Sequence, residues 1–272
     1  MPEGNTTHRL AQRHQRYYGG SPVAVSSPQG RFSAAAAVLD GLVLQRADAH
    51  GKHLFHVYRP DLVVHVHLGL YGAFTEATLP VQPPRGQVRM RLVGATHWTD
   101  LRGPTACELL TEHEADAVRA RLGPDPLRPD GDPDRAWARI SRSRAPLATL
   151  LMDQSVLAGV GNVYRAELLF RHQLDPLLPG CELRADQWTA LWSDLADLMA
   201  DGVRRGRIDT VRPEHDPVRM GRPARQDRHG GEVYVYRRTG APCLVCGTAV
   251  VAARHGGRNL YWCPHCQGRS AS

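Results

Sequence analysis

The sequence predicts an α+β multidomain protein, with an N-terminal antiparallel β-sandwich and flanking helices, then a helical domain, then a small cysteine-containing module. Short apolar segments separated by Gly, Pro and Asp lie between residues 23 and 101, a pattern typical of antiparallel strands. Helical periodicity dominates between about residues 134 and 205. Two Cys-x-x-Cys pairs lie close to the C-terminus. At 272 residues the chain is long enough for more than one hydrophobic core.

The N-terminal domain is expected over residues 1–123. It opens with an amphipathic helix over residues 5–18, which places Leu10, His14 and Tyr17 on one stripe. Strands are expected over residues 23–26, 42–47, 53–59, 62–68, 72–76, 88–93 and 96–101, and a further helix over residues 112–122.

A Pro/Asp/Gly-rich stretch without hydrophobic periodicity, residues 124–134, predicts an interdomain linker. The helical domain is expected over residues 135–231. Its helices are expected over residues 136–141, 146–152, 163–172 and 185–205. Residues 206–231 are loop-like, and a loop of this length is either functional or disordered. This loop carries five arginines: Arg212, Arg219, Arg222, Arg225 and Arg228.

The excess of positive charge lies in the last quarter of the chain. Residues 1–199 contain 21 Lys+Arg and 21 Asp+Glu, whereas residues 200–272 contain 13 and 6, so the formal charge of +7 belongs to the second range. A basic region of this kind favours a polyanionic partner, nucleic acid first, although a solvated surface is the alternative. The chain has no run of about 18 apolar residues and no secretion signal, which predicts a cytoplasmic protein without membrane contact.

The chain begins Met1-Pro2-Glu3-Gly4. Removal of Met1 would leave Pro2 as a free secondary amine beside the acid Glu3, which would place a nucleophile next to a proton carrier. The alternative is that Pro and Glu simply open a helix. Lys52 is the only lysine, and the turn His50-Gly51-Lys52 is expected to project it from a hairpin.

Two other groups of residues could bind metal. His65 and His67 alternate along one strand and share a face, but no third ligand is apparent, so we interpret them as hydrogen-bonded structural histidines. The cysteines form two knuckles separated by sixteen residues: Cys243-Leu-Val-Cys246 and Cys263-Pro-His-Cys266. This spacing predicts one structural Zn²⁺ with four thiolate ligands. Disulfides are the competing interpretation, whereas Cys107 and Cys181 are expected to stay unpaired.

Between the knuckles, residues 254–259 should form the exposed tip of a zinc ribbon, where arginine can reach a phosphate. Zinc ribbons also mediate protein contacts, so the motif alone leaves both partners open. A second phosphate-binding candidate is Gly159-Val-Gly161-Asn162, because glycines allow close approach and the start of a helix suits an anion.

These motifs together resemble a known family. Residues 151–170, Leu-Met-Asp-Gln-Ser-Val-Leu-Ala-Gly-Val-Gly-Asn-Val-Tyr-Arg-Ala-Glu-Leu-Leu-Phe, resemble the helix-two-turn-helix of the formamidopyrimidine-DNA glycosylase and endonuclease VIII family. Residues 232–272 resemble its zinc finger, and Met1-Pro2-Glu3-Gly4 resembles its start. Three further stretches resemble the actinobacterial endonuclease VIII branch: His50-Gly51-Lys52-His53-Leu54, Leu70-Tyr71-Gly72 and Tyr261-Trp262-Cys263-Pro264.

The resemblance implies a bifunctional DNA glycosylase/AP lyase of base excision repair. Pro2 would attack the damaged nucleotide and form a Schiff base (iminium), Glu3 would shuttle protons, and Lys52 would act as an acid or orient a phosphate. Strand cleavage would follow by β,δ-elimination. Oxidised pyrimidines are the expected substrates, with oxidised purines (formamidopyrimidine or 8-oxoguanine) as the alternative. A non-catalytic zinc-containing DNA-binding protein is the alternative from another class.

The resemblance also implies DNA-binding roles. Leu70 and Tyr71 would fill the gap left by the everted base, but Gly69 replaces the Gln of the best-known endonuclease VIII pattern, so recognition of the opposite base is open. Asn162 and Arg258 would hold phosphates. A supporting role within the site follows for one acid, Glu167. The expected partner is damaged double-stranded DNA, with single-stranded DNA left open, bound by a monomer in the cytoplasm at the nucleoid.

Overall fold

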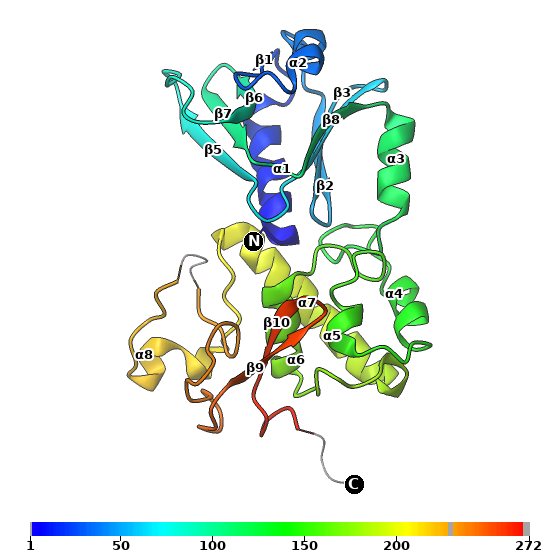
Figure 1. Cartoon of the computed structure of the whole chain (residues 1–272), viewed down its shortest axis with the longest axis vertical. Helices are drawn as coiled ribbons and strands as arrows, with labels where there is room; N and C mark the ends of the chain where they lie inside the picture. Colours follow the sequence, from blue (N-terminus) through cyan, green and yellow to red (C-terminus); the bar gives the residue numbers. More distant parts are fainter. Residues whose placement is uncertain (1, 228–230, 269–272) are drawn as a thin grey trace. The chain divides into compact units, whose positions relative to one another are not determined.

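The structure, a computed structural model, describes residues 2–227 and 231–268 of the chain. It consists of two compact units, Met1–Arg121 and Leu122–Ser272 (Figure 1). The finer division of the sequence into four segments stays a prediction. None of the described helices is both long enough and apolar enough to cross a membrane.

The N-terminal unit is built on two four-stranded antiparallel sheets, with strand orders β1-β6-β7-β5 and β2-β3-β4-β8. The strands are β1 Ala24–Ser26, β2 Arg46–His50, β3 His53–Arg59, β4 Leu62–His67, β5 Ala73–Thr78, β6 Val88–Val93, β7 His97–Arg102 and β8 Ala106–Leu110. Leu92 of the first sheet and Leu54 and Val66 of the second belong to one buried core. The two sheets therefore pack face to face, and the predicted sandwich is confirmed.

Three helices complete this unit: α1 Gly4–Tyr18, α2 Ser33–Leu39 and α3 Glu112–Ala120. Helix α1 buries Leu10 and His14, as the stripe predicted, but buries Tyr18 in place of the expected Tyr17, and it packs against β2 and β3. Helix α3 begins with a capping box, in which the Thr111 hydroxyl accepts from the Glu114 N–H and the Glu114 carboxylate accepts from the Thr111 N–H. These contacts hold the start of α3.

Two elements of this unit were not expected from the sequence. Helix α2 contains four consecutive alanines, and their high helix propensity outweighs the β pattern around them. Strand β8 lacks the alternation of a half-buried strand and is recruited by pairing with β4. The strand expected over residues 42–47 is also displaced, because Val43 and Leu44 form only isolated bridges and β2 begins at Arg46.

The C-terminal unit is helical, with α4 Pro133–Ile140, α5 Leu147–Leu150, α6 Asn162–Arg171, α7 Ala185–Arg205 and α8 Pro217–Met220, and 3-10 segments η1 Gly180–Glu182 and η2 Pro213–His215. Helix α7 buries Leu191, Leu195 and Met199 in a core that also contains Tyr164 and Leu168 of α6. The predicted range of α7 is confirmed. The helix expected over 146–152 is a single turn.

The last two strands, β9 Val251–His255 and β10 Arg258–Trp262, form an antiparallel hairpin. Gly256 and Gly257 connect them with φ of +56° and +74°, a left-handed conformation that glycine adopts without steric cost. Leu260 packs into the helical core of the unit, whereas Tyr261 packs into the core around the cysteines. The hairpin is therefore fixed on both faces, and the predicted ribbon with its tip between the knuckles is confirmed.

Candidate functional site

The start of α1 places a buried acid next to Pro2. Glu3 is the N-cap residue of α1, its carbonyl accepts from the Thr6 N–H at 3.0 Å, and only 1% of the residue is exposed. The positive end of a helix dipole stabilises a negative charge at this position. Pro2 precedes it in an irregular conformation and is half-buried. An acid and the backbone nitrogen of Pro2 therefore lie on neighbouring residues.

Lys52 lies in the two-residue turn between β2 and β3, as the sequence predicted. Gly51 adopts φ of +57° there, so this position favours glycine. The Lys52 carbonyl accepts a hydrogen bond from the ring Nδ1–H of His67 on β4 at 3.1 Å. The turn that carries the lysine is therefore tied to the neighbouring strand.

A buried polar chain connects α1 to this hairpin. His14 Nδ1 lies 2.9 Å from His56 Nε2, and His14 Nε2 lies 3.1 Å from a Glu76 carboxylate oxygen. Burial raises the pKa of Glu76, but His14 and Arg13 outweigh it and leave that pKa below its usual value. The ionised acid, His14 and His56 therefore form a continuous row of buried polar groups from β5 through α1 to β3.

The contact between His14 and His56 also fixes how far α1 is shifted along the β2–β3 hairpin. Lys52 precedes His56 by about 13 Å of strand, and Glu3 precedes His14 by about 16 Å of helix. Figure 1 shows both the first turn of α1 and the β2–β3 turn at the same end of the N-terminal unit. The unit thus gathers Pro2, Glu3 and Lys52 at one end.

Three histidines stack beside Lys52. The ring of His53 lies 5.1 Å from that of His65 and 4.7 Å from that of His67, and His65 Nδ1 lies 2.8 Å from a Glu108 carboxylate oxygen. Burial, together with the neighbouring histidines, lowers the pKa of His53 to about 3, and burial lowers the pKa of His65 despite Glu108. His53 and His65 are therefore neutral at pH 7. His65 and His67 are hydrogen-bonded, as the sequence interpretation expected, and their purely structural role stays a prediction.

Two apolar side chains project from the turn between β4 and β5. Leu70 is 60% exposed and Tyr71 is 87% exposed. The turn is closed by the Gly72 N–H, which donates to the Leu68 carbonyl at 3.0 Å. Neighbouring exposed large apolar residues on a closed turn are typical of a binding surface.

In the C-terminal unit, Asn162 is the first residue of α6 and follows the glycine turn. The Gln154 side chain holds this turn, since its amide donates to the Val160 carbonyl at 2.9 Å and its oxygen accepts from the Gly159 N–H at 3.1 Å. Gly159 adopts φ of +92°. The turn that leads into α6 is therefore held in shape by hydrogen bonds from the Gln154 side chain.

Asn162 also joins α6 to the ribbon. Its Nδ2 donates to the Asn259 carbonyl on β10 at 3.0 Å, and its Oδ1 accepts from the Arg165 guanidinium. Arg165 is 2% exposed and donates to the same Asn259 carbonyl at 3.1 Å. A second contact, between Thr149 Oγ1 and His255 Nε2 at 2.8 Å, fixes the other strand of the ribbon. The turn before Arg258 is thus held against the helices by hydrogen bonds on both sides.

Glu167, on α6, is fully buried and binds backbone amides. One carboxylate oxygen accepts from the N–H groups of Val235 and Tyr236 at 2.9 and 2.8 Å. The other accepts from the Tyr234 N–H at 2.6 Å and from the Thr210 hydroxyl at 2.6 Å. Glu167 therefore fastens the segment that leads into the cysteine module.

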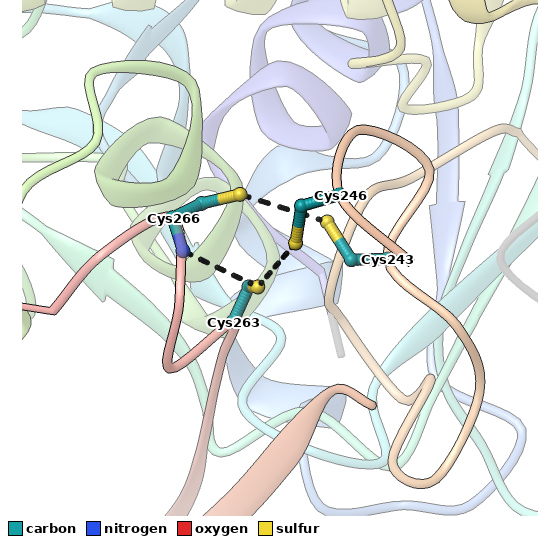
Figure 2. A group of neighbouring side chains, drawn as sticks. All are labelled: Cys243, Cys246, Cys263 and Cys266. Atoms are coloured by element: carbon teal, nitrogen blue, oxygen red, sulfur yellow. Dashed lines mark hydrogen bonds between the residues drawn. The ribbon is translucent and has the colours of Figure 1, made fainter. Parts of the chain in front are cut away.

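The four cysteines of the two knuckles point toward a common centre (Figure 2). Their sulfurs lie within 4.8 Å of one another, with 3.9 Å between Cys243 and Cys266 and 3.5 Å between Cys246 and Cys263. A tetrahedral ion with Zn–S bonds of about 2.3 Å requires sulfurs about 3.8 Å apart, whereas a disulfide requires about 2.0 Å. The geometry therefore fits a four-thiolate metal site and not two disulfides.

Arg258 opens β10 beside the glycine turn and is exposed. The arginines of the preceding loop are engaged differently: Arg222 pairs with Glu232 at 2.7 Å and Arg225 pairs with Asp227 at 2.7 Å. Arg228 lies outside the described residues. Two of the loop's positive charges are therefore partly neutralised within the protein.

Three supporting residues escaped the sequence reasoning: Gln154, Arg165 and Asn259. The first holds a turn through local bonds, and a Gln five residues before a glycine turn carries no distinctive pattern. The other two meet across 94 residues of chain. Only Asn162, already singled out, could have pointed to them.

The fold and the site define a class: a protein with a β-sandwich, a helix-two-turn-helix unit and a four-cysteine finger. The model of the formamidopyrimidine-DNA glycosylase N-terminal domain matches residues 1–107, the H2TH domain of the same glycosylases matches residues 122–212, and the zinc finger found in FPG and IleRS matches residues 240–268.

Relatives agree with these matches. Endonuclease 8 1 of Mycobacterium tuberculosis is 57% identical over 98% of this chain and 100% of the relative. Formamidopyrimidine-DNA glycosylase of Streptococcus pneumoniae is 30% identical over 85% of this chain and 84% of the relative. The Lactococcus lactis formamidopyrimidine-DNA glycosylase bound to DNA containing an AP site shares the fold, with a TM-score of 0.78, 19% identity, and 98% of this chain and 100% of that chain covered.

The chain belongs to the formamidopyrimidine-DNA glycosylase and endonuclease VIII family. It is a DNA-repair glycosylase with AP lyase activity. The alternative of a non-catalytic DNA-binding protein is thereby excluded.

Proposed function

We propose that the enzyme removes oxidised pyrimidines from damaged double-stranded DNA, forms a covalent intermediate through Pro2, and cuts the strand by β,δ-elimination. The observation that carries the chemistry is the fully buried acid Glu3 at the helix start directly after Pro2, with the Lys52 turn at the same end of the unit. Support for pyrimidines is the 57% identity with an enzyme named Endonuclease 8 1.

The chemistry begins once Met1 is removed. The Pro2 nitrogen attacks C1′, the glycosidic bond breaks and the base departs. Opening of the sugar breaks the C1′–O4′ bond and leaves a C1′=N⁺ iminium. A terminal amine suits this step because its pKa is about 7.7–8.0, against about 10.4 for lysine, so a larger neutral fraction is available at pH 7.

Glu3 donates the proton that O4′ needs on ring opening and, as a carboxylate, removes a proton from C2′, which the iminium has acidified. Loss of the 3′ phosphate by β-elimination and of the 5′ phosphate by δ-elimination then follows. The Lys52 ammonium holds one of these phosphates and supplies a proton to a leaving oxygen. Because the ring of His67 donates to the Lys52 carbonyl, the turn is held in place for this role.

The remaining residues position DNA and metal. Leu70 and Tyr71 fill the gap that the everted base leaves, and Asn162 and Arg258 hold the phosphates that flank it. The Glu167 carboxylate positions residues 234–236. In the knuckles, Zn²⁺ is the structural ion that four thiolates favour, so the metal takes no part in the reaction.

Borohydride trapping tests the nucleophile. The protein, with Met1 removal verified by intact mass, is incubated with borohydride and a duplex containing thymine glycol. A covalent adduct is expected for the parent and a weaker one for Pro2→Gly, because the primary amine of glycine can still form an imine but lacks the ring that fixes the secondary amine. Equal trapping by Pro2→Gly would remove Pro2 as the nucleophile.

A matched pair at Lys52 and a single variant at Glu3 test the other roles. Lys52→Arg should keep more activity than Lys52→Met, because arginine retains the charge although not the ammonium geometry. Glu3→Gln should lower the single-turnover cleavage rate by about 100-fold or more, which is the usual contribution of a general acid–base. A parallel duplex containing 8-oxoguanine tests the substrate: faster processing of that lesion than of thymine glycol would favour the purine alternative.

A further inference from the structure

The turn that carries Leu70 and Tyr71 is interlocked with a second turn, between β7 and β8. Thr105, in that second turn, donates its backbone N–H to the His67 carbonyl at 2.9 Å, immediately before the exposed turn begins. Gly103 adopts φ of +59°, and a Cβ there would lie 3.3 Å from the Tyr71 carbonyl oxygen. The β7–β8 turn is therefore hydrogen-bonded to the start of the exposed turn and passes close to the Tyr71 backbone.

The Thr105 side chain lies where a side chain at position 69 would begin. The φ of Gly69 is +66°, a region that residues other than glycine rarely adopt, and a Cβ built on it would lie 1.9 Å from the Thr105 hydroxyl oxygen and 3.0 Å from the Thr105 Cβ. A Cβ at 1.9 Å from an oxygen does not occur in real structures, so a side chain at position 69 would require the Thr105 hydroxyl to turn away.

Thr105 is itself exposed, beside the exposed Leu70 and Tyr71. Its hydroxyl is a polar group at the base of two apolar side chains. A hydroxyl can donate one hydrogen bond and accept others, so it can pair with the edge of a purine or a pyrimidine. Position 69 cannot supply such a group.

We propose that Thr105 is a specificity-determining residue that contacts the base opposite the lesion in place of the missing side chain at position 69. The inference rests on the proposed function, in which Leu70 and Tyr71 enter the gap left by the lesion. A single short hydroxyl replaces a longer amide. The enzyme therefore reads the opposite base with one hydrogen bond at this position.

The first test compares Thr105→Val, which keeps the side-chain shape and removes the hydroxyl, with Thr105→Ser, which keeps the hydroxyl. Single-turnover rates are measured on thymine-glycol duplexes with A, C, G or T opposite the lesion. Thr105→Val should slow cleavage by about 2- to 10-fold, the effect of one lost hydrogen bond, and by different factors for different opposite bases. Thr105→Ser should keep the parental pattern.

A structural role for Thr105 would slow all four duplexes equally, so an equal effect of Thr105→Val on the four would overturn the proposal. Borohydride trapping of the parent protein on the same duplexes is the control for the proposed glycosylase mechanism. A parent that forms no adduct refutes the nucleophilic mechanism, whereas an active parent with an unchanged opposite-base pattern in Thr105→Val refutes only the role of Thr105.

The second test uses the steric exclusion. Gly69→Gln alone should lose cleavage activity, because the new side chain meets Thr105. Adding Thr105→Gly removes the clash but not the backbone strain at φ +66°, so the double variant should recover part of the activity that Gly69→Gln loses. Gly69→Gln as active as the double variant would overturn the exclusion of a side chain at position 69.

Discussion

Replacing Glu167 by Gln exchanges one buried carboxylate oxygen for an NH₂ group. We expect this small change to destabilise the C-terminal unit. The amide must put its NH₂ group on one side. Toward Val235 and Tyr236 it would face two N–H donors, whereas toward Tyr234 it would face one N–H and the Thr210 hydroxyl. The second orientation is favoured, because Thr210 can accept instead and turn its own proton toward the Glu232 carbonyl at 3.3 Å.

The magnitude follows from this orientation. One buried N–H, that of Tyr234, loses its acceptor at about 1–3 kcal/mol, and the remaining bonds lose their charge assistance, so Glu167→Gln should lower the free energy of unfolding by about 3 kcal/mol. Glu167→Ala leaves three N–H groups unpaired and should cost about 5 kcal/mol. Either loss is a large part of the total stability of a domain, typically about 5–15 kcal/mol.

Urea unfolding followed by tryptophan fluorescence measures this loss, since four of the five tryptophans, Trp137, Trp188, Trp192 and Trp262, belong to the C-terminal unit. Glu214→Gln is the matched control, because Glu214 is an exposed carboxylate of the same unit, and it should change stability by less than about 0.5 kcal/mol. If Glu167→Gln unfolded within 0.5 kcal/mol of the parent, the role of Glu167 as a backbone anchor would be wrong.

Three further predictions concern metal, pH and DNA affinity. Cys263→Ser, or a strong chelator, should abolish the one-to-one zinc content measured by elemental analysis and shift the Trp262 emission to that of exposed indole; full zinc retention would contradict the four-thiolate site. The folded pKa of His53 is about 3 against about 6.5 when unfolded, so the unfolded state binds more protons between these values. Stability should therefore fall as pH drops below about 6.5, by up to about 1.4 kcal/mol per pH unit, and His53→Gln should flatten this slope in pH-dependent denaturation. Arg165→Met should weaken binding of an abasic-site duplex about 3- to 10-fold in a fluorescence titration while the salt dependence stays unchanged, because this arginine is buried; a reduced salt slope would mean that it contacts phosphate.

The sequence was sufficient to predict those features that depend on residues close together in the chain. The knuckles, the Lys52 turn and the range of α7 follow from local spacing and periodicity, and all three are present in the structure. The short helix α2 was missed because its run of alanines shows neither the alternation of a strand nor the periodicity of an amphipathic helix. The roles of Asn162, Arg258 and the catalytic residues stay predictions.

Features that depend on distant residues could not be predicted. The partners of Glu167 lie 43 to 69 residues away along the chain, and nothing in the Glu167 sequence context distinguishes a backbone anchor from a catalytic acid. The exclusion of a side chain at Gly69 by Thr105 likewise requires two turns to meet. From the sequence, Gly69 was a missing amide, whereas the structure shows a position that another residue already fills.

The shared Asn259 carbonyl has a consequence for how damaged sites are found. Because Asn162 and Arg165 both bind it, the spacing between the start of α6 and the ribbon turn is a fixed dimension of one folded unit. In the proposed complex any adjustment between this junction and the DNA backbone therefore has to come from the DNA. Deforming a 20–30 base-pair site costs about 1–6 kcal/mol, and the energy is lower where stacking is already weakened. A rigid junction would therefore make the stiffness of the duplex itself the first property by which the enzyme distinguishes damaged from intact DNA, before any base leaves the helix.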